Sequence, residues 1–309
     1  MENSKNYAVY AAGLLYTLIT GLSFLVSKIG LSVSGPFDLL AYRFSAAFLG
    51  LLILVLLGRV RLGMDLKALK RIMPLAVLYP LLFFSFQTFG LRYASSSEAG
   101  ILSATIPIIT LVLAAYFLRE RTTGLQKLAV IVSVAGVIYI TLMKGSAVAF
   151  TDLRGVILLL LSALSFAGYS VMARRLSRDF TSAELSNVMI IICFIAFNVL
   201  SMGNHLAKGT LNNFFSPLKD PGFILAALYL GVLSSLGTSL ATNYMLSKME
   251  ASKMSVFSNL STVISIIAGV VFLKEELLYY HLVGSILIIG GVIGTNFLDE
   301  KHLKGKRQA

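Results

Sequence analysis

The chain has 309 residues, of which 57% are hydrophobic and 13% charged, and its mean hydropathy is +0.85. This balance excludes an ordinary soluble domain and predicts a polytopic membrane protein. The formal net charge of +12 raises the question of nucleic-acid binding, but the basic residues gather in alternate loops between apolar stretches, so we expect no nucleic-acid partner.

Ten stretches are long and apolar enough to cross a bilayer, which takes about 20 residues for about 30 Å of hydrocarbon. We predict spans at 8–30, 37–58, 72–91, 97–118, 123–143, 155–173, 182–203, 221–247, 253–273 and 278–298. Capping-box patterns at Ser95–Glu98 and Thr181–Glu184 predict the starts of the fourth and seventh helices. We interpret both glutamates as helix caps rather than as proton carriers.

The distribution of basic residues predicts the orientation. The termini and the predicted loops on their side of the membrane hold seventeen Lys and Arg residues, and the opposite loops hold six. By the positive-inside rule we expect both termini in the cytoplasm. We therefore predict a multi-pass protein of a bacterial inner membrane.

The chain also contains an internal repeat. Residues 91–137 align with 246–292 at a shift of 155 positions without a gap, which places Leu118-Arg119-Glu120 on Leu273-Lys274-Glu275 and Gly136-Val137 on Gly291-Val292. Five spans per half is an odd number, so the two halves would insert in opposite directions. The sequence predicts an all-α membrane protein with ten transmembrane helices in two inverted five-helix repeats, 1–145 and 153–309, the second with a basic cytoplasmic tail.

Several of these motifs occur in an order that resembles a known family. The run Tyr93–Leu102, then Pro107, Phe117-Leu118-Arg119-Glu120 and Gly136-Val137, together with Arg43-Phe44 in the second span, resembles the EamA-type repeat of the drug/metabolite transporter superfamily. The resemblance covers nearly the whole chain. It implies a ten-helix bundle with a central substrate cavity between the repeats, working by alternating access.

The resemblance does not identify the substrate, because the superfamily handles amino acids, sugars, nucleotide sugars, phosphorylated sugars, amines and drugs. The second copy also departs from the pattern. Thr262 replaces the proline, and Lys253 aligns with Glu98. The two halves therefore need not be functionally equivalent.

Polar side chains within the spans are the candidates for substrate binding, because an unpaired polar group in lipid is costly. The fourth and ninth spans carry matching polar faces at spacings of three and four residues, and the third and eighth spans are interrupted by proline, glycine and hydroxyl residues. The alternative is that small and hydroxyl residues simply let helices pack closely. The predicted substrate-binding residues are Tyr79, Gln87, Ser103, Tyr169, Thr238, Thr242, Asn243, Ser255, Ser258, Asn259 and Thr262.

Two cations also lie within predicted spans. Lys28 is near the end of the first span, where we expect its amine to reach the interface. Arg43 lies about six residues into the second span. We favour a structural anchor on a peripheral helix over anion binding, although the sequence leaves open whether either cation faces the cavity.

The residues argue against catalysis. No carboxylate pair lies in the middle of a span, the three histidines lie in loops or at span ends, and there is no phosphate-binding glycine loop or activated nucleophile. We expect no enzyme activity, no metal and no cofactor.

The polar, charge-poor candidate site favours a secondary transporter that exports a small neutral or zwitterionic metabolite, such as an amino acid. The alternative is a carrier of phosphorylated sugars or nucleotide sugars, which would require Arg43 or Lys28 in the cavity. A more remote alternative is a non-transporting membrane enzyme or scaffold. Since two matched halves can enclose a cavity alone, we expect a monomer whose partners are the small-molecule substrate and the lipid bilayer.

Overall fold

The computed structural model describes residues 2–60, 66–94, 99, 102–120, 122–143, 152–261, 263–264, 267 and 278–306, and no strand occurs among them. Six helices in these segments are long and apolar enough to cross a membrane: Tyr7–Val33, Pro36–Leu56, Ala68–Tyr93, Leu153–Leu176, Ser182–Lys208 and Pro221–Lys248. Shorter apolar helices follow at Ile106–Leu118, Gly124–Ile140 and Tyr279–Thr295. The prediction of a helical membrane protein is confirmed, whereas the count of ten spans stays a prediction.

Each described α-helix coincides with or overlaps a predicted span. The first half contains α1 (Glu2–Val33), α2 (Pro36–Leu56), α3 (Leu66–Ala76), η1 (Val77–Leu82), α4 (Phe83–Tyr93), α6 (Ile106–Leu113), η2 (Ala114–Leu118) and α7 (Gly124–Met143). The second half contains α8 (Leu153–Leu176), α9 (Ser182–Lys208), η3 (Leu211–Asn213), η4 (Ser216–Lys219), α10 (Pro221–Leu228), η5 (Tyr229–Gly237), α11 (Thr238–Lys248), α12 (Ala251–Ser255) and α14 (Tyr279–Lys306).

Local sequence explains where α9 begins. Thr181 Oγ1 accepts a hydrogen bond from the Glu184 amide at 3.3 Å, and Glu184 Oε2 accepts one from the Thr181 amide at 2.7 Å. This confirms the capping box predicted there, in which two free amides of a helix start are satisfied reciprocally. The corresponding pattern at Ser95–Glu98 lies outside the described residues.

The third and eighth predicted spans are both interrupted in the middle. Wider helical turns form η1 between α3 and α4, and η5 between α10 and α11. Within η1, Tyr79 has an extended backbone with φ −143° and ψ 127°, so the regular hydrogen-bond ladder is broken there. The predicted interruption of these two spans is therefore present in both halves.

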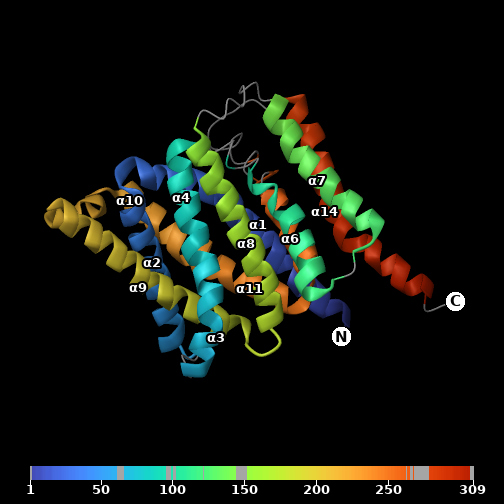
Figure 1. Ribbon diagram of the computed structural model, residues 1–309, viewed down its shortest axis with the longest axis horizontal. Coiled ribbons are helices and arrows are strands. Elements are labelled where there is room, and N and C mark those ends of the chain that lie inside the picture. Colours follow the sequence, from blue (N-terminus) through green and yellow to red (C-terminus); the bar gives the residue numbers. More distant parts are fainter. Residues whose placement is uncertain are drawn as a thin grey trace.

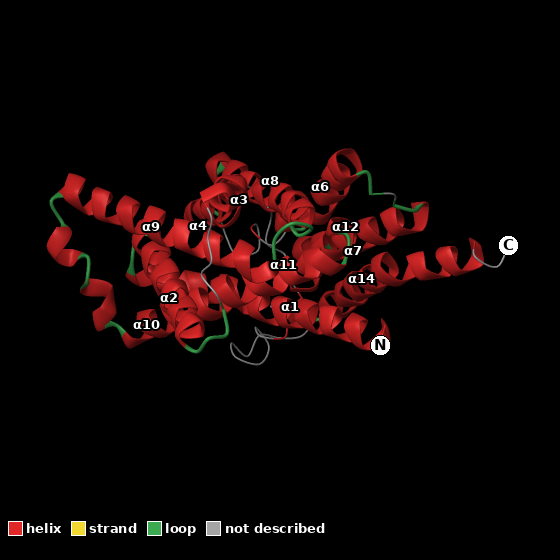
Figure 2. Cartoon of the chain, turned by 90° about the horizontal axis from the view of Figure 1, so that it is seen from below, coloured by secondary structure: helices red, strands yellow, loops and turns green. Residues whose placement is uncertain are grey.

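The helices pack as a bundle in which segments far apart in sequence are neighbours. α2 lies against α9, α4 against α8, α1 against α11, and α7 against α14. Figure 1 shows α7 and α14 side by side along one flank, with α2 and α9 on the opposite side. In Figure 2 the start of α1 and the end of α14 again lie towards the same flank.

A corner between helices links the two halves. The carboxylate of Glu120 accepts hydrogen bonds from the Ala251 amide at 3.0 Å and from the Ser252 hydroxyl at 2.9 Å. These groups lie at the start of α12, where free amides and the helix dipole favour an anion. The acid of the first Leu-basic-Glu corner thus caps a helix of the second half. Its counterpart Glu275 lies outside the described residues.

Glycines allow α7 and α14 to approach closely, and we call this contact the glycine seam. A Cβ built on Gly136 would lie 2.8 Å from the Gly284 carbonyl oxygen, and one on Gly291 would lie 2.6 Å from the Ala129 carbonyl oxygen. Neither position has room for a side chain. Small residues at such contacts let helix backbones meet in a membrane, where packing rather than the hydrophobic effect drives association.

The glycine seam can be tested with two neighbouring glycines. Gly291→Ala places a methyl group against the backbone of α7, and we expect it to lower the free energy of unfolding by about 1–3 kcal/mol, the usual cost of overpacking. Gly290→Ala is the matched control because a Cβ there meets nothing within 4 Å. Thermal unfolding in detergent can be followed through reaction of the single, buried Cys193 with a thiol-reactive fluorophore. Equal stabilities would contradict the seam.

Candidate functional site

A buried network of neutral polar groups joins α8, α9 and α11, and we call it the central cluster. The Tyr169 hydroxyl donates to Asn243 Oδ1 at 2.8 Å, and Asn243 Nδ2 donates to Ser186 Oγ at 2.9 Å. The Ser239 hydroxyl donates to the same Ser186 oxygen at 3.1 Å. All four side chains are buried. Because the network contains hydroxyl and amide groups alone, it can exchange hydrogen bonds with a substrate without carrying a fixed charge.

Aromatic rings border the central cluster on the side of the first half. Tyr79 of η1 stacks on Tyr169 with ring centroids 4.5 Å apart, and Phe84 lies 5.3 Å from Tyr79. The extended backbone at Tyr79 places its ring among these neighbours. The broken spans of both halves therefore meet at the central cluster.

Arg43 of α2 lies next to this aromatic border. Its side chain is 3% exposed, and Nε donates to Ser235 Oγ at 2.7 Å, while Nη2 donates to Ser234 Oγ at 3.0 Å and to the Ser234 carbonyl oxygen at 3.1 Å. The guanidinium carbon lies 3.7 Å from the centroid of the Phe84 ring. Although α2 lies on a flank of the bundle (Figure 1), its buried face packs against α9, η5 and α4, and Arg43 is on that face.

The structure brings together part of the predicted set. Tyr79, Tyr169, Thr238 and Asn243 lie in or beside the central cluster. Thr242, one residue before Asn243, is buried, and its hydroxyl has no hydrogen-bond partner among the described residues. Gln87 is half-buried on α4. Thr242 falls on Gln87 when the two halves are aligned at the shift of 155 positions.

Other predicted residues make contacts elsewhere. The hydroxyls of Ser255 and Ser258 donate to carbonyl oxygens of their own segment, at 2.9 and 2.6 Å. Asn259 Nδ2 donates to Ser133 Oγ of α7 at 3.2 Å, and these contacts fit the helix-packing alternative. Ser103 is half-buried before α6. Thr262 lies outside the described residues.

Sequence reasoning missed two members of the central cluster, Ser186 and Ser239. Ser186 is the fifth residue of α9, just after the capping box, and nothing in its local sequence distinguishes it from an ordinary helix serine. Ser239 lies in the polar interruption of the eighth span, and that neighbourhood is the sequence signal that points to it. Both serines acquire their role from the crossing of α9 and α11.

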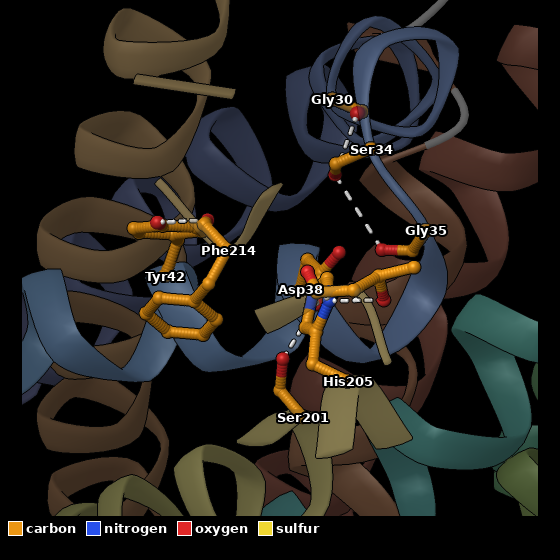
Figure 3. Close-up of polar contacts among 9 residues, drawn as sticks. Gly30, Ser34, Gly35, Asp38, Tyr42, Ser201, His205 and Phe214 are labelled. Atoms are coloured by element: carbon orange, nitrogen blue, oxygen red, sulfur yellow. Dashed lines mark hydrogen bonds and ion pairs between the residues drawn. The ribbon is translucent and has the colours of Figure 1, made fainter. Parts of the chain in front are cut away.

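A second polar group lies at the end of the bundle where α1 meets α2 (Figure 3). Asp38 Oδ1 accepts a hydrogen bond from the Ser201 hydroxyl at 2.5 Å and lies 3.1 Å from His205 Nε2. His205 Nδ1 lies 2.9 Å from the Thr210 carbonyl oxygen. Nearby, the Tyr42 hydroxyl donates to the Phe214 carbonyl oxygen at 2.6 Å. These contacts tie α2 to α9 and to the loop that follows α9.

An apolar groove of about 640 Å³ lies between α1 and the α10–η5 segment. Val26, Ile29, Leu225 and Tyr229 are among its lining residues. Leu225 is 68% exposed and Ile29 is 44% exposed, so this groove belongs to the outer surface of the bundle. It shares no residue with the central cluster. Among the described residues, no group of three or more His, Cys, Asp or Glu could hold a metal ion.

The contacts of Asp38 can be tested through the stability of the protein. Asp38→Ala leaves the Ser201 hydroxyl and the His205 ring without their shared acceptor, so we expect the free energy of unfolding to fall by about 1–3 kcal/mol. Asp179→Ala is the control because its ion pair with Arg71 is exposed, and such pairs contribute at most about 1 kcal/mol. The same Cys193 labelling assay measures both. An Asp179→Ala variant that loses as much stability as Asp38→Ala would contradict this interpretation.

Comparisons with known proteins agree with this architecture. The model of the EamA-like transporter family matches residues 8–142 and 153–297. "Uncharacterized transporter YcxC" of Bacillus subtilis (strain 168) is 50% identical over 304 residues, which cover 98% of this chain and 97% of the relative. An "Uncharacterized transporter" of Archaeoglobus fulgidus is 27% identical over 273 residues, which cover 88% of this chain and 92% of that protein.

A solved structure shares the fold. The chain superposes on a solved structure titled "Crystal structure of protein" with a TM-score of 0.73 and 19% sequence identity. The match covers 96% of this chain and 98% of the other. The family match spans most of the chain, and the relatives are transporters rather than enzymes. The chain therefore belongs to the EamA-like transporter family, within the drug/metabolite transporter superfamily, and is a multi-pass membrane transporter.

Proposed function

We propose that this transporter exports a small neutral or zwitterionic metabolite, such as an amino acid, by alternating access. The observation that carries the proposal is the central cluster, in which Tyr169, Asn243 and Ser186 form a buried network without an acidic member. It lies where the interrupted spans of the two halves meet. Interrupted spans in corresponding positions are typical of substrate sites in secondary transporters.

An arrangement of two inverted five-helix repeats, 1–145 and 153–309, is part of this proposal. Three observations support it. The family model matches the chain twice. The packing of α4 on α8 has a counterpart in the packing of α11 on α1, while α2 with α9 and α7 with α14 pair equivalent helices. At the shift of 155 positions, η1 falls on residues 232–237 of η5. Ten spans with both termini in the cytoplasm of a bacterial inner membrane complete the model, and a single chain suffices for transport.

The chemistry of the central cluster supports the substrate class. A carrier of a cation with net charge would need a carboxylate to replace water around the substrate. The described acidic residues that contact polar partners, including Asp38, Glu120 and Glu184, do so at helix ends. An ammonium group can instead interact with the faces of Tyr79 and Tyr169, since aromatic rings attract cations.

The alternative of a sugar-phosphate carrier has less support. A phosphate group carries close to two negative charges at neutral pH and is usually held by several cations. Lys28 is exposed, and Arg43 is the one Lys or Arg side chain that is fully buried among the described residues. One buried positive charge fits a monoanionic group better than a phosphate.

Counterflow in proteoliposomes tests the proposed function. The purified protein is loaded with unlabelled compound and offered labelled amino acids, amines, sugar phosphates or nucleotide sugars, each with and without a pH gradient. We expect saturable exchange of at least one zwitterion and none of the sugar phosphates. Flux confined to sugar phosphates or nucleotide sugars, or no flux with any amino acid, would overturn the proposal.

Substitutions of two asparagines within spans test whether the central cluster binds the substrate. Asn243→Ala should raise the KM for the exchanged zwitterion roughly tenfold or more, because two buried partners of the amide lose their hydrogen bonds. Asn198→Ala is the control, since Asn198 also lies within a span but bonds to Ser45 and to its own helix. An unchanged KM in folded Asn243→Ala protein would place the substrate elsewhere.

A further inference from the structure

We propose that Arg43 binds the carboxylate of the transported zwitterion and so determines that the substrate must carry an acid group. This inference rests on the proposed function and makes it more specific. It begins from the charge of Arg43, since a guanidinium stays protonated in proteins. The side chain is 3% exposed and lies between α2, η5 and the aromatic border of the central cluster.

The hydrogen bonds of Arg43 leave one end of the guanidinium available. A guanidinium has five N–H donors: one on Nε and two on each Nη atom. Nε bonds to Ser235, and Nη2 bonds to the hydroxyl and the carbonyl oxygen of Ser234. Three donors are therefore used by η5. Both N–H groups of Nη1 have no acceptor among the described residues.

The positive charge also has no protein counterion in the described structure. No described carboxylate forms an ion pair with Arg43. The guanidinium contacts hydroxyls, one carbonyl oxygen and the Phe84 ring. These dipoles can orient the guanidinium, but they do not neutralise it.

Such a charge is expensive to bury unless an anion joins it. Removing an ion from water costs several kcal/mol, and within a membrane bundle charged side chains normally pair with an opposite charge or with backbone carbonyls, or face a wet pathway. The Ser234 carbonyl oxygen is such a partner for Nη2, but it carries no negative charge. A carboxylate from the substrate would supply that partner. The guanidinium is also a preferred group for carboxylate recognition, because its planar donors match the two oxygens.

The location of Arg43 fits the rest of the substrate. Arg43 contacts Phe84, Phe84 lies against Tyr79, and Tyr79 stacks on Tyr169. Tyr169 in turn bonds to Asn243. A zwitterion with its carboxylate at Arg43 would therefore lie beside Phe84, the ring that links Arg43 to the two tyrosines and the central cluster. Arg43 thereby positions the substrate beside groups that come from both halves.

The test compares three labelled forms of whichever amino acid exchanges best: the acid, its carboxamide and the amine that lacks the carboxylate. In the wild-type protein, we expect the acid to compete at least tenfold better than the other two, the usual scale of a charged hydrogen bond. Arg43→Gln should abolish this preference by raising the KM for the acid tenfold to a hundredfold, without weakening exchange of the amide and the amine, which are cations at neutral pH. Arg43→Lys should keep part of the preference for the acid that Arg43→Gln loses.

Lys28→Gln is the matched control because it removes an equal charge from an exposed position in the same half. We expect its preference for the acid to equal that of the wild type. A preference that disappears equally in Lys28→Gln would show a general electrostatic effect and would overturn the proposal. The same conclusion would follow if folded Arg43→Gln protein kept the preference for the acid.

The wild-type comparison keeps the proposal testable even if Arg43 variants do not fold. Equal exchange of the acid, amide and amine by the wild type would refute carboxylate recognition while leaving a transporter of neutral or zwitterionic compounds in place. A complete lack of exchange with amino acids and amines would instead refute the proposed function. A sugar phosphate that exchanges and loses affinity in Arg43→Gln would assign the guanidinium to phosphate and overturn the carboxylate.

Discussion

Hydrocarbon offers no hydrogen bonds, so a span that departs from a regular helix needs neighbouring side chains to satisfy the backbone groups it releases. This requirement governs the arrangement around η1 and η5. The Ser234 carbonyl oxygen accepts from Arg43 and from the Thr238 hydroxyl, and the Leu230 carbonyl oxygen accepts from Ser235. The bent η5 segment is thus held by donors from α2, from η5 itself and from the first residue of α11. Arg43, one of those donors, also lies against the Phe84 ring of the aromatic border.

The polar interior is divided into two parts of different character. Around Asn243 every group is neutral, and its partners are the hydroxyls of Tyr169 and Ser186 and the thioether of Met189. Around Arg43 a full positive charge is surrounded by dipoles, with no described acid beside it. The proposed zwitterion, neutral as a whole but with a carboxylate at one end, would place that carboxylate at Arg43 and the rest of the molecule near the neutral part. This is why the fold and the charge distribution lead to the same substrate class.

Local patterns predicted the helices well, whereas the contacts between helices needed the structure. The capping box at Thr181 predicted the start of α9 because both of its partners lie within one turn. Ser186, only five residues later, gives no local sign that it will meet Asn243 of α11. The polar periodicity of the ninth span placed Asn259 on a common face with its neighbours, yet its amide bonds to α7. Arg43 was found within its span, but its burial depends on η5, nearly two hundred residues away.

The glycine seam has a consequence for how the chain matures. The backbone of α7 meets that of α14 at Gly136 and Gly284, and nearly half of the chain is synthesised between these two residues. Until α14 is synthesised, the face of α7 that forms the glycine seam contacts lipid or another protein. Domains usually fold from the N-terminus during synthesis, but here an early helix waits for the last described one. Docking of α14 on the glycine-lined face of α7 is therefore a late step of biogenesis. Defects in α14 would leave that face of α7 without its partner helix.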